Sequence, residues 1–460
     1  MKSWGRILFD VTQRMRRAPT LDMLEAIQSE PYESRAKILE LQFSRLARLL
    51  AVAEAHVPYY REMFRTLGCH SHDIRSVEDL SALPILTKDI IRERLPELIR
   101  EDQPKQKLIL RHSGGSTGVP LMFYRSADEL FRCEAGVLAN CMQSAWRPGS
   151  MVAYFWGFDA GLYAMRSWEF ELRQHLRRMY QFDPFHSGSA DMDRWLQKWD
   201  RLRPAIALGY ASTIARFAEH IESSGGQVRP LLGVFTTAEK LYQPQQETIA
   251  RVFQCRVFDM YGSSEVNNIA CSCARGNMHV NAGNVVLEVE GNRVCPGEPS
   301  ALIVTALNNF SMPFIRYRNE DCGELLDGVC DCGSQSPLMK LDIARVSDNF
   351  TLPGGQVVHG EFFTHLMYGS KGIASFQFRQ TTLDSIILRV VPGPAEPSAR
   401  DRAIREAVAQ VEGLDPSRTL KVQVEEVETI PLSAAGKHRF TLSDVPPPGS
   451  RSSLEYTDAK

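Results

Sequence analysis

The sequence predicts an α/β protein in which a large N-terminal domain with mixed and parallel sheets is followed by a small C-terminal α+β domain. In the middle of the chain, strand-like and helical runs alternate, which is typical of a largely parallel sheet. After Gly283 the alternation gives way to strands and turns, and residues 348–444 then form a separate pattern of strand, strand, helix and strand. We therefore expect domains at 1–347 and 348–444, with a tail at 445–460.

Residues 1–100 are predicted to form a mostly helical entry segment. Leucines at helical spacing between Arg35 and Ala55 predict one long helix that ends near Pro58. A second apolar stripe lies at the N-terminus, on the side away from Arg6 and Arg14, and consists of Trp4, Ile7, Leu8, Val11 and Met15. We expect this stripe to dock on the rest of the protein, and a helix that lies on a membrane surface is the alternative.

The middle of the chain begins with a predicted hairpin. The strand candidate Leu108–Arg111 runs into the loop SGGSTGVP, residues 113–120, and Leu121–Tyr124 follows as a second strand. Four further strands are predicted at Val152–Trp156, Ala205–Leu208, Leu231–Thr236 and Val257–Tyr261, and helices between them at Ser212–Glu222 and Gln243–Phe253. The small domain has strands in SFQFR, SIILRVV and LKVQVEEVE and a helix at Ala399–Val411. The tail is rich in proline and serine, which predicts disorder.

The overall composition favours a protein that acts on small molecules. Of 460 residues, 53 are Lys or Arg and 55 are Asp or Glu, so no basic excess indicates nucleic-acid binding. No apolar run has the length of a membrane span, and the N-terminus lacks the pattern of a secretory signal. With 10 cysteines in a chain of this length, we expect a reduced cytoplasmic protein with a metal site in preference to a disulfide scaffold.

Four short motifs carry residues suited to nucleotide chemistry. The loop of residues 113–120 can direct backbone N–H groups and hydroxyls at an anion, although the same composition suits an ordinary hairpin. YGSSEV, residues 261–266, follows a predicted parallel strand, where Glu265 could hold Mg²⁺. Asp321 in RYRNEDCGE could accept hydrogen bonds from a ribose diol, and Lys437 follows Gly436 on a loop of the small domain. Taken alone, each of the last three motifs is better explained by a solvated turn.

In this order and spacing, the four motifs resemble those of the adenylate-forming superfamily, which contains acyl-CoA ligases, luciferases and nonribosomal adenylation domains. The similarity covers nearly the whole chain. Within the superfamily, the chain is most similar to the phenylacetate–CoA ligase branch, which includes capsule-locus homologues. The segments that carry this closer similarity are AHVPYYREMF, LSALPILTKDIIRE, VFTTAEKL, MPFIRYRNED and CDCG. The resemblance implies an adenylate-forming large domain and a mobile small domain that acts as a lid.

The resemblance also implies a role for each matching residue. The phosphates of ATP would be held by Ser113, Gly114, Gly115, Ser116, Thr117 and Gly118. The adenine would pack against Ala238, Glu239, Tyr261 and Gly262. Phosphate and Mg²⁺ would be contacted by Ser264 and Glu265, and the ribose by Asp321 with the help of Arg345. Asp348 would be the hinge, and Lys437 would bridge the acid's carboxylate and the α-phosphate. The chain departs from the family's pattern at Glu320 and Ala344, which stand where the family has glycine.

A group of cysteine and histidine residues predicts a structural zinc site. Cys271 and Cys273 precede His279 in ACSCARGNMHV, and CDCG adds Cys330 and Cys332. Thiolates and imidazole suit tetrahedral Zn²⁺, while reduced cysteines packed as small apolar residues are the alternative. The resemblance implies a Cys…His…Cys-x-Cys site at matching places. We therefore expect Cys273, His279, Cys330 and Cys332 as ligands, with Cys271 as a substitute for Cys273.

The sequence thus predicts a ligase that uses ATP to form an acyl-adenylate and passes the acyl group to an acceptor. The first hypothesis is an acid–CoA ligase for an aromatic or otherwise compact carboxylic acid. Candidate pocket residues, which core packing explains as often, are Tyr154, Phe155, Trp156 and Tyr210. An amine or a carrier-protein thiol is the alternative acceptor. A nucleotide-binding homologue without catalysis is a third interpretation, which the retention of all four motifs opposes, and a homodimer remains open.

Overall fold

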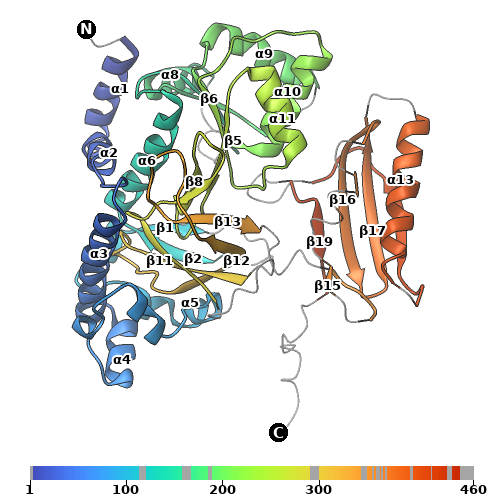
Figure 1. The fold of residues 1–460 in the computed structure, drawn as a ribbon. Coiled ribbons are helices and arrows are strands. Elements are labelled where there is room, and N and C mark those ends of the chain that lie inside the picture. The colour runs from blue at the N-terminus through green and yellow to red at the C-terminus, as the bar shows by residue number, and fades with distance from the viewer. Residues whose placement is uncertain are drawn as a thin grey trace. The chain divides into compact units, whose positions relative to one another are not determined.

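The computed structural model describes residues 4–112, 121–157, 167–184, 189–290, 300–342, 350–354, 357–358, 363, 366–367, 370–393, 397–415, 417–431 and 438–445. The chain divides into two compact units (Figure 1). The first comprises Met1–Asn319 and Gly323–Leu341, and the second Glu320–Cys322 and Asp342–Lys460. The expected hinge at Asp348 and the expected disordered tail from residue 446 onward lie outside the described residues.

Helices form the N-terminal part of the first unit, as predicted. They are α1 (Trp4–Met15), α2 (Thr20–Gln28), α3 (Arg35–His56), α4 (Pro58–Leu67) and α5 (Lys88–Arg94). The Ser34 side chain accepts a hydrogen bond from the Lys37 N–H and so caps α3, while Pro58 starts α4 and Gly68 ends it in the left-handed conformation. Local sequence therefore sets the limits of the long helix.

The N-terminal stripe does not dock as expected. Phe9 and Gln13 form the buried face of α1, whereas Trp4, Val11 and Met15 on the opposite side are exposed. A helix with apolar residues on two faces can bury only one of them, and Phe9 has the larger contact with the protein's core.

The predicted hairpin around the glycine loop is present. Strand β1 (Ile109–His112) pairs antiparallel with β2 (Met122–Arg125), with His112 opposite Met122. The loop between them, residues 113–120, lies outside the described residues. Helix α6 (Ala127–Cys141) follows directly and begins with a capping box between Ser126 and Glu129.

An eleven-stranded sheet forms the centre of the first unit, in the order β10-β11-β12-β13-β9-β8-β7-β6-β5-β3-β4. One half is parallel, as the alternating pattern predicted: β3 (Val152–Phe155), β4 (Met179–Phe182), β5 (Ile206–Tyr210), β6 (Gly233–Thr237) and β7 (Val257–Tyr261). The other half consists of β8 (Ala270–Ser272), β9 (Met278–Val280), β10 (Val285–Val289), β11 (Ser300–Ala306), β12 (Tyr317–Leu326) and β13 (Leu338–Asp342). Antiparallel pairing begins between β7 and β8.

Helices cover both faces of the parallel half, and its strands are therefore buried on both sides. These helices are α6 together with α8 (Ser167–Arg177), α9 (Ser189–Leu202), α10 (Ala211–Ser223) and α11 (Gln243–Phe253). Phe155 and Phe182 belong to the core cluster that includes Phe217 of α10, whereas Phe235 belongs to the cluster that includes Leu138 of α6. Alternate residues of each strand thus face different helices, which explains the nearly continuous apolar runs in the sequence.

The second unit contains a four-stranded sheet in the order β18-β17-β16-β19. Its elements are β14 (Phe350–Thr351), β15 (Val357–Val358), β16 (Ile373–Thr382), β17 (Ser385–Pro392), α13 (Pro397–Glu412), β18 (Lys421–Glu426) and β19 (Thr441–Ser443). Ala407 and Val411 of α13 share a buried cluster with Phe378 and Leu388 of the sheet. The predicted strands and helix of this region are all present. Across both units, no helix within the described ranges is long and apolar enough to cross a bilayer.

Candidate functional site

The carboxyl ends of the parallel strands meet at one edge of the sheet and carry most of the predicted site. The register pairs Tyr210 at the end of β5 with Thr237 at the end of β6, and Thr237 with Met260 of β7. Ala238 and Glu239 therefore follow β6 at the edge where Gly262 and Ser264 follow β7. Ligands of open α/β sheets bind at this edge, because the strand-to-helix loops leave a crevice there.

The turn after β7 requires its glycine. A Cβ atom at Gly262 would lie 2.9 Å from the backbone nitrogen of Asn268. The turn is closed by the Ser263 N–H, which donates to the Val266 carbonyl at 3.0 Å, and by the Val266 N–H, which donates to Ser263 Oγ at 3.0 Å. Tyr261 packs in the core, and its hydroxyl accepts a hydrogen bond from Asn319 Nδ2 at 2.7 Å.

Glu265 is a buried carboxylate in this turn, with 4% of its surface exposed. The Tyr317 hydroxyl donates to its Oε1 over 3.4 Å, and this is the side-chain hydrogen bond seen for Glu265 among the described residues. A carboxylate at this edge of the sheet can hold a divalent cation that prefers oxygen ligands.

Two side chains that the sequence analysis missed hold the backbone of this turn. Arg125, at the end of β2, is 1% exposed, and its guanidinium donates to the Glu265 carbonyl at 2.6 Å and the Ser264 carbonyl at 3.4 Å. Asn309 Nδ2 donates to the same Glu265 carbonyl at 3.3 Å. Arg125 thereby links the strand that leaves the glycine loop to the turn that carries Glu265. No motif identifies either residue, because both contacts join segments far apart in the sequence.

Backbone strain marks the turn after β6. Ala238 has a φ of 66°, in the left-handed region that residues with a side chain rarely adopt. Glu239 accepts a hydrogen bond from the Ser212 N–H at 2.9 Å, at the N-terminus of α10. A carboxylate is favourable there because the first N–H groups of a helix carry partial positive charge.

Aromatic rings stand at the ends of β3 and β5, and the structure divides the four predicted pocket residues between two faces. The ring centroids of Trp156 and Tyr210 are 4.4 Å apart, and those of Tyr154 and Trp156 are 5.6 Å apart. Phe155 instead points to the other face, where it is fully buried with Phe182. The pocket interpretation is therefore wrong for Phe155, since alternate residues of a strand face opposite sides. Burial, the neighbouring Tyr154 and the Glu239 carboxylate raise the pKa of Tyr210.

Of the other predicted residues, Asp321 is described and several are not. Asp321 is buried within β12, after Glu320, whose φ is 67°. A left-handed residue is expected where the family has a glycine. The phosphate loop Ser113–Gly118, Arg345 and Lys437 lie outside the described residues.

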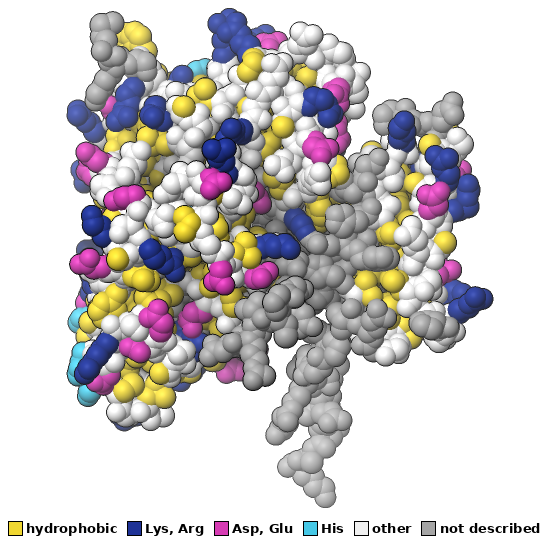
Figure 2. All heavy atoms as spheres, in the orientation of Figure 1, with side chains coloured by type: hydrophobic (Ala, Val, Ile, Leu, Met, Phe, Trp, Pro, Cys, Tyr) yellow, Lys and Arg dark blue, Asp and Glu magenta, His cyan; other side chains and the backbone are white. Residues whose placement is uncertain are grey.

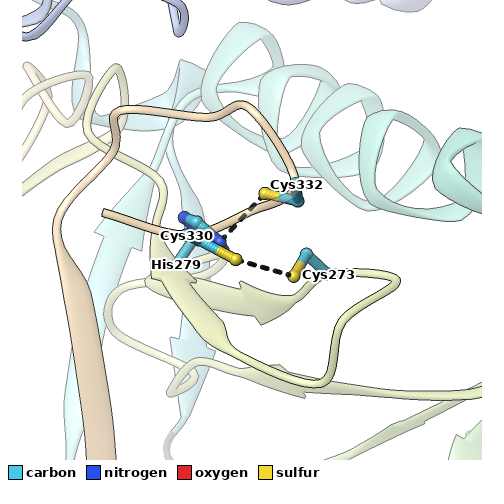
Figure 3. A group of neighbouring side chains, drawn as sticks. All are labelled: Cys273, His279, Cys330 and Cys332. Carbon is cyan, nitrogen blue, oxygen red and sulfur yellow. Dashed lines mark hydrogen bonds between the residues drawn. The ribbon is translucent and has the colours of Figure 1, made fainter. Parts of the chain in front are cut away.

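Four predicted metal ligands come together in the first unit (Figure 3). The ligand atoms of Cys273, His279, Cys330 and Cys332 all lie within 4.8 Å of one another. Cys273 follows β8, His279 lies in β9, and Cys330 and Cys332 lie on the loop between β12 and β13. The cluster therefore joins a short hairpin to a loop more than fifty residues away.

The distances in this cluster fit a tetrahedral ion. Two Zn–S bonds of about 2.3 Å at the tetrahedral angle place the sulfur atoms about 3.8 Å apart, and the Sγ atoms of Cys273 and Cys330 are 3.7 Å apart. One Zn–S and one Zn–N bond give about 3.5 Å, and Cys332 Sγ lies 3.4 Å from His279 Nε2. The separations are those expected of ligands around one small cation.

Within the cluster, Cys330 differs from Cys271 in the direction of its pKa, whereas burial raises the pKa of Cys332 to about 11. Burial works to raise the pKa of Cys330, but hydrogen bonds from Asn277 and from the Cys332 N–H outweigh it and hold that pKa below its ordinary value. A thiolate is the form that binds metal. Burial raises the pKa of Cys271 well above its ordinary value, and its Sγ lies 3.4 Å from Gln143 Nε2, outside the cluster. The geometry thus selects Cys273 and leaves Cys271 as a buried thiol.

Comparison with known proteins finds similarity along most of the chain. The CapK C-terminal domain family matches residues 350–444. Protein CapK of Staphylococcus aureus is 23% identical over 426 residues, which cover 89% of this chain and 90% of CapK. A phenylacetate-coenzyme A ligase of Thermus thermophilus is 24% identical over 439 residues, which cover 89% of this chain and 97% of the ligase. The crystal structure of 2-hydroxyisobutyryl-CoA ligase in the postadenylation state, in complex with R3-HIB-AMP, has the same fold, with a TM-score of 0.71, 19% identity and coverage of 90% and 91%.

Proposed function

We propose that this chain, which belongs to the adenylate-forming superfamily and to its phenylacetate–CoA ligase-like branch, uses ATP to convert a carboxylic acid into an acyl-adenylate and transfers the acyl group to CoA. The family resemblance and the α/β fold class predicted from the sequence are confirmed by the curated relatives and the similar structure. The observation that carries the proposal is Glu265, a buried carboxylate at the ligand-binding edge of the parallel sheet.

The reaction has two steps, and both build negative charge on oxygen. An oxygen of the acid's carboxylate attacks the α-phosphorus of ATP, which releases pyrophosphate and leaves the acyl-adenylate. The sulfur of CoA then attacks the acyl carbon and releases AMP. Mg²⁺ held by Glu265 would supply positive charge at the phosphates. Lys437, by its place in the family's motif, would bridge the two anions in the first step.

The adenosine part of ATP would occupy the turns that follow β6 and β7. Ala238 and Glu239 would pack against the adenine together with Tyr261 and Gly262. The strained φ of Ala238 supports this assignment, because left-handed residues with side chains gather at functional sites. Asp321 would accept hydrogen bonds from the ribose hydroxyls. Ser264 would donate to a phosphate, and the loop of residues 113–118 would hold the β- and γ-phosphates.

The acid is proposed to be compact, and the acceptor to be CoA. The ring of Trp156, which stacks on Tyr154 and on the buried Tyr210, offers an apolar wall at the same edge of the sheet. Such a wall suits an aromatic or short branched acid, whose apolar part gains from leaving water. We place the enzyme in the cytoplasm, where ATP, CoA and reduced thiols are available.

A structural zinc ion is proposed at Cys273, His279, Cys330 and Cys332. The 3.7 Å and 3.4 Å separations of the ligand atoms support it. Four protein ligands leave no position for a water molecule, so the ion would stabilise the fold and take no part in catalysis.

The experiment is ATP–pyrophosphate exchange with a panel of carboxylic acids, followed by mass spectrometry of the products formed with CoA, with amines and with a carrier protein. Exchange that depends on one class of acid, with a CoA thioester as product, is the expected result. Lys437→Ala should lower exchange by about 10²-fold or more, because one transition-state cation is lost, while Lys421→Ala on the exposed edge strand β18 should not. An absence of exchange with every acid would overturn the proposal, and an amide or a carrier thioester would overturn the choice of CoA.

A further inference from the structure

Helix α1 presents an apolar stripe to solvent. Trp4 and Met15 are 80% and 78% exposed, and Ile7 and Val11 are 41% and 46% exposed. At 3.6 residues per turn, these four positions fall within about 80° of one another around the helix axis. Phe9 and Gln13, which hold α1 on the protein, lie on the opposite side. The stripe is therefore not part of the contact by which α1 packs.

Helix α8, which packs against α1, also exposes large apolar side chains. Trp168 and Leu172, one helical turn apart, are 60% and 51% exposed. The two helices are in contact, and Thr12 Oγ1 of α1 donates a hydrogen bond to the Leu176 carbonyl of α8 at 2.9 Å. We call these six exposed side chains with the two helices that carry them the α1–α8 surface. Single exposed apolar side chains are common on protein surfaces, whereas a cluster of large ones marks a site of interaction.

Arginines accompany the α1–α8 surface. Residues 4–18 contain four arginines, at positions 6, 14, 16 and 17, against the single acidic residue Asp10. Arg6 is paired with Asp10 at 2.7 Å and Arg16 with Glu134 at 3.0 Å, which leaves the exposed Arg14 and Arg17 outside the ion pairs of the described residues. Figure 2 has the orientation of Figure 1, and dark blue side chains of Lys and Arg gather in the region where Figure 1 shows α1.

We propose that the α1–α8 surface docks the protein on a membrane that contains anionic phospholipids. Tryptophan, with its apolar body and polar N–H, suits the boundary between headgroups and acyl chains, and the arginines suit the lipid phosphates. A short helix of this kind lies in the plane of the interface with its apolar side inserted.

The same charges oppose a second copy of the chain as the occupant. A symmetric pair of chains would bring identical surfaces face to face, because a two-fold interface joins each patch to itself. Arg14 and Arg17 at the end of α1 would then approach their copies, and Asp10, the acidic residue of α1, is already paired with Arg6. An anionic membrane surface would instead attract these arginines.

The test is co-sedimentation of the purified full-length chain with vesicles. One set contains equal parts of phosphatidylcholine and phosphatidylglycerol, and the other phosphatidylcholine alone. We expect the wild type to bind the anionic vesicles, to bind the neutral ones much less, and to be released by high salt. The double variant Trp4→Ser/Val11→Ser should bind at least about tenfold more weakly, since burying each of these side chains is worth about a factor of ten or more.

Two controls separate docking from damage to the fold. Leu67→Ser, at the exposed end of α4, removes a similarly exposed apolar side chain outside the α1–α8 surface and should leave binding unchanged. Arg14→Gln/Arg17→Gln should weaken binding and reduce its salt dependence while helix content stays the same by circular dichroism. Failure of the wild type to bind anionic vesicles at low salt, or equal binding by Trp4→Ser/Val11→Ser, would overturn the proposal. So would light scattering that shows a wild-type dimer converted to a monomer by that variant, because the surface would then belong to a second copy.

Discussion

Removal of one thiolate from the Cys/His cluster should release the metal and loosen the first unit alone. Cys330→Ser is the sharpest change, because the Cys330 Sγ lies 3.7 Å from that of Cys273 and accepts a hydrogen bond from Asn277 Nδ2 at 3.2 Å. Serine keeps the size of the side chain but offers an alcohol that stays protonated. The variant thus removes one ligand and leaves the packing nearly unchanged.

The size of the effect follows from the binding free energy of structural zinc sites. Zinc bound by four protein ligands contributes about 10–16 kcal/mol near neutral pH. Divided over four ligands, one thiolate accounts for about 2.5–4 kcal/mol, a loss of roughly 70- to 900-fold in affinity. For a domain of this size, the melting temperature should fall by about 5 °C or more, taking about 2 °C for each kcal/mol.

The assay combines metal analysis with differential scanning calorimetry. Wild-type protein purified under reducing conditions without chelators should contain about one zinc ion for each chain. Cys330→Ser should contain little, and only the transition of the first unit should move, because all four ligands lie in that unit. The matched control is Cys271→Ser, which replaces a buried cysteine two residues from Cys273 and should keep its zinc.

Two results would refute this reasoning. Wild-type protein free of zinc and other metals would mean that the four side chains pack as a reduced cluster. Equal loss of zinc in Cys271→Ser and Cys330→Ser would mean that the ligand set is wrong, since only one of these residues belongs to the cluster.

Three further variants test other features. Arg125→Met removes the buried hydrogen bond to the Glu265 carbonyl, which is worth about 1.5–3 kcal/mol. Pyrophosphate exchange should therefore fall about 10- to 100-fold and should require a higher Mg²⁺ concentration. An unchanged Mg²⁺ dependence would contradict this role of Arg125. Asp415→Asn should destabilise the second unit, because hydrogen bonds from Ser417, Thr419 and Leu420 hold the pKa of Asp415 well below its ordinary value. That stabilisation is present above about pH 4 and is lost as the pH falls toward the lowered pKa, so a deficit in melting temperature that persisted in strong acid would exclude it. Glu320→Gly should raise the midpoint of urea unfolding slightly. The left-handed backbone of Glu320 costs about 1–2 kcal/mol, and the greater freedom of glycine in the unfolded chain offsets about 0.4–1 kcal/mol of the stability gained by removing that cost. A lower midpoint would show that the Glu320 side chain stabilises the fold.

The parallel half of the sheet was predictable because its strands are buried on both faces. The prediction of Val257–Tyr261 agrees with β7, and that of Gln243–Phe253 with α11. Such strands need apolar residues at nearly every position, whereas the helices between them need apolar residues only along one face. Continuous apolar runs therefore alternate with apolar residues at helical spacing, and the two patterns are easy to tell apart. The N-terminal helix was predicted with its apolar stripe, but the contacting face was not. Periodicity shows that apolar residues share a side of a helix and does not show which neighbour covers them.

The residues of the candidate site are of two kinds. Some belong to a local sequence motif and could be predicted, and others contact the site only because the chain folds. Glu265 could be proposed from the sequence because it lies four residues after the end of its strand, so local spacing places it at the edge where ligands bind. Arg125 could not, because a charged residue after the apolar run LMFY is most simply explained as the exposed end of a strand. Only the folded chain places its guanidinium against carbonyl groups 139 and 140 residues away. A buried arginine is stabilised by acceptors for its N–H groups, and the Glu265 turn provides them for Nη2. Arg125 therefore holds the Glu265 turn in position, and the turn provides acceptors for the buried Arg125. A change in either one should disturb both the position of the turn and the burial of Arg125.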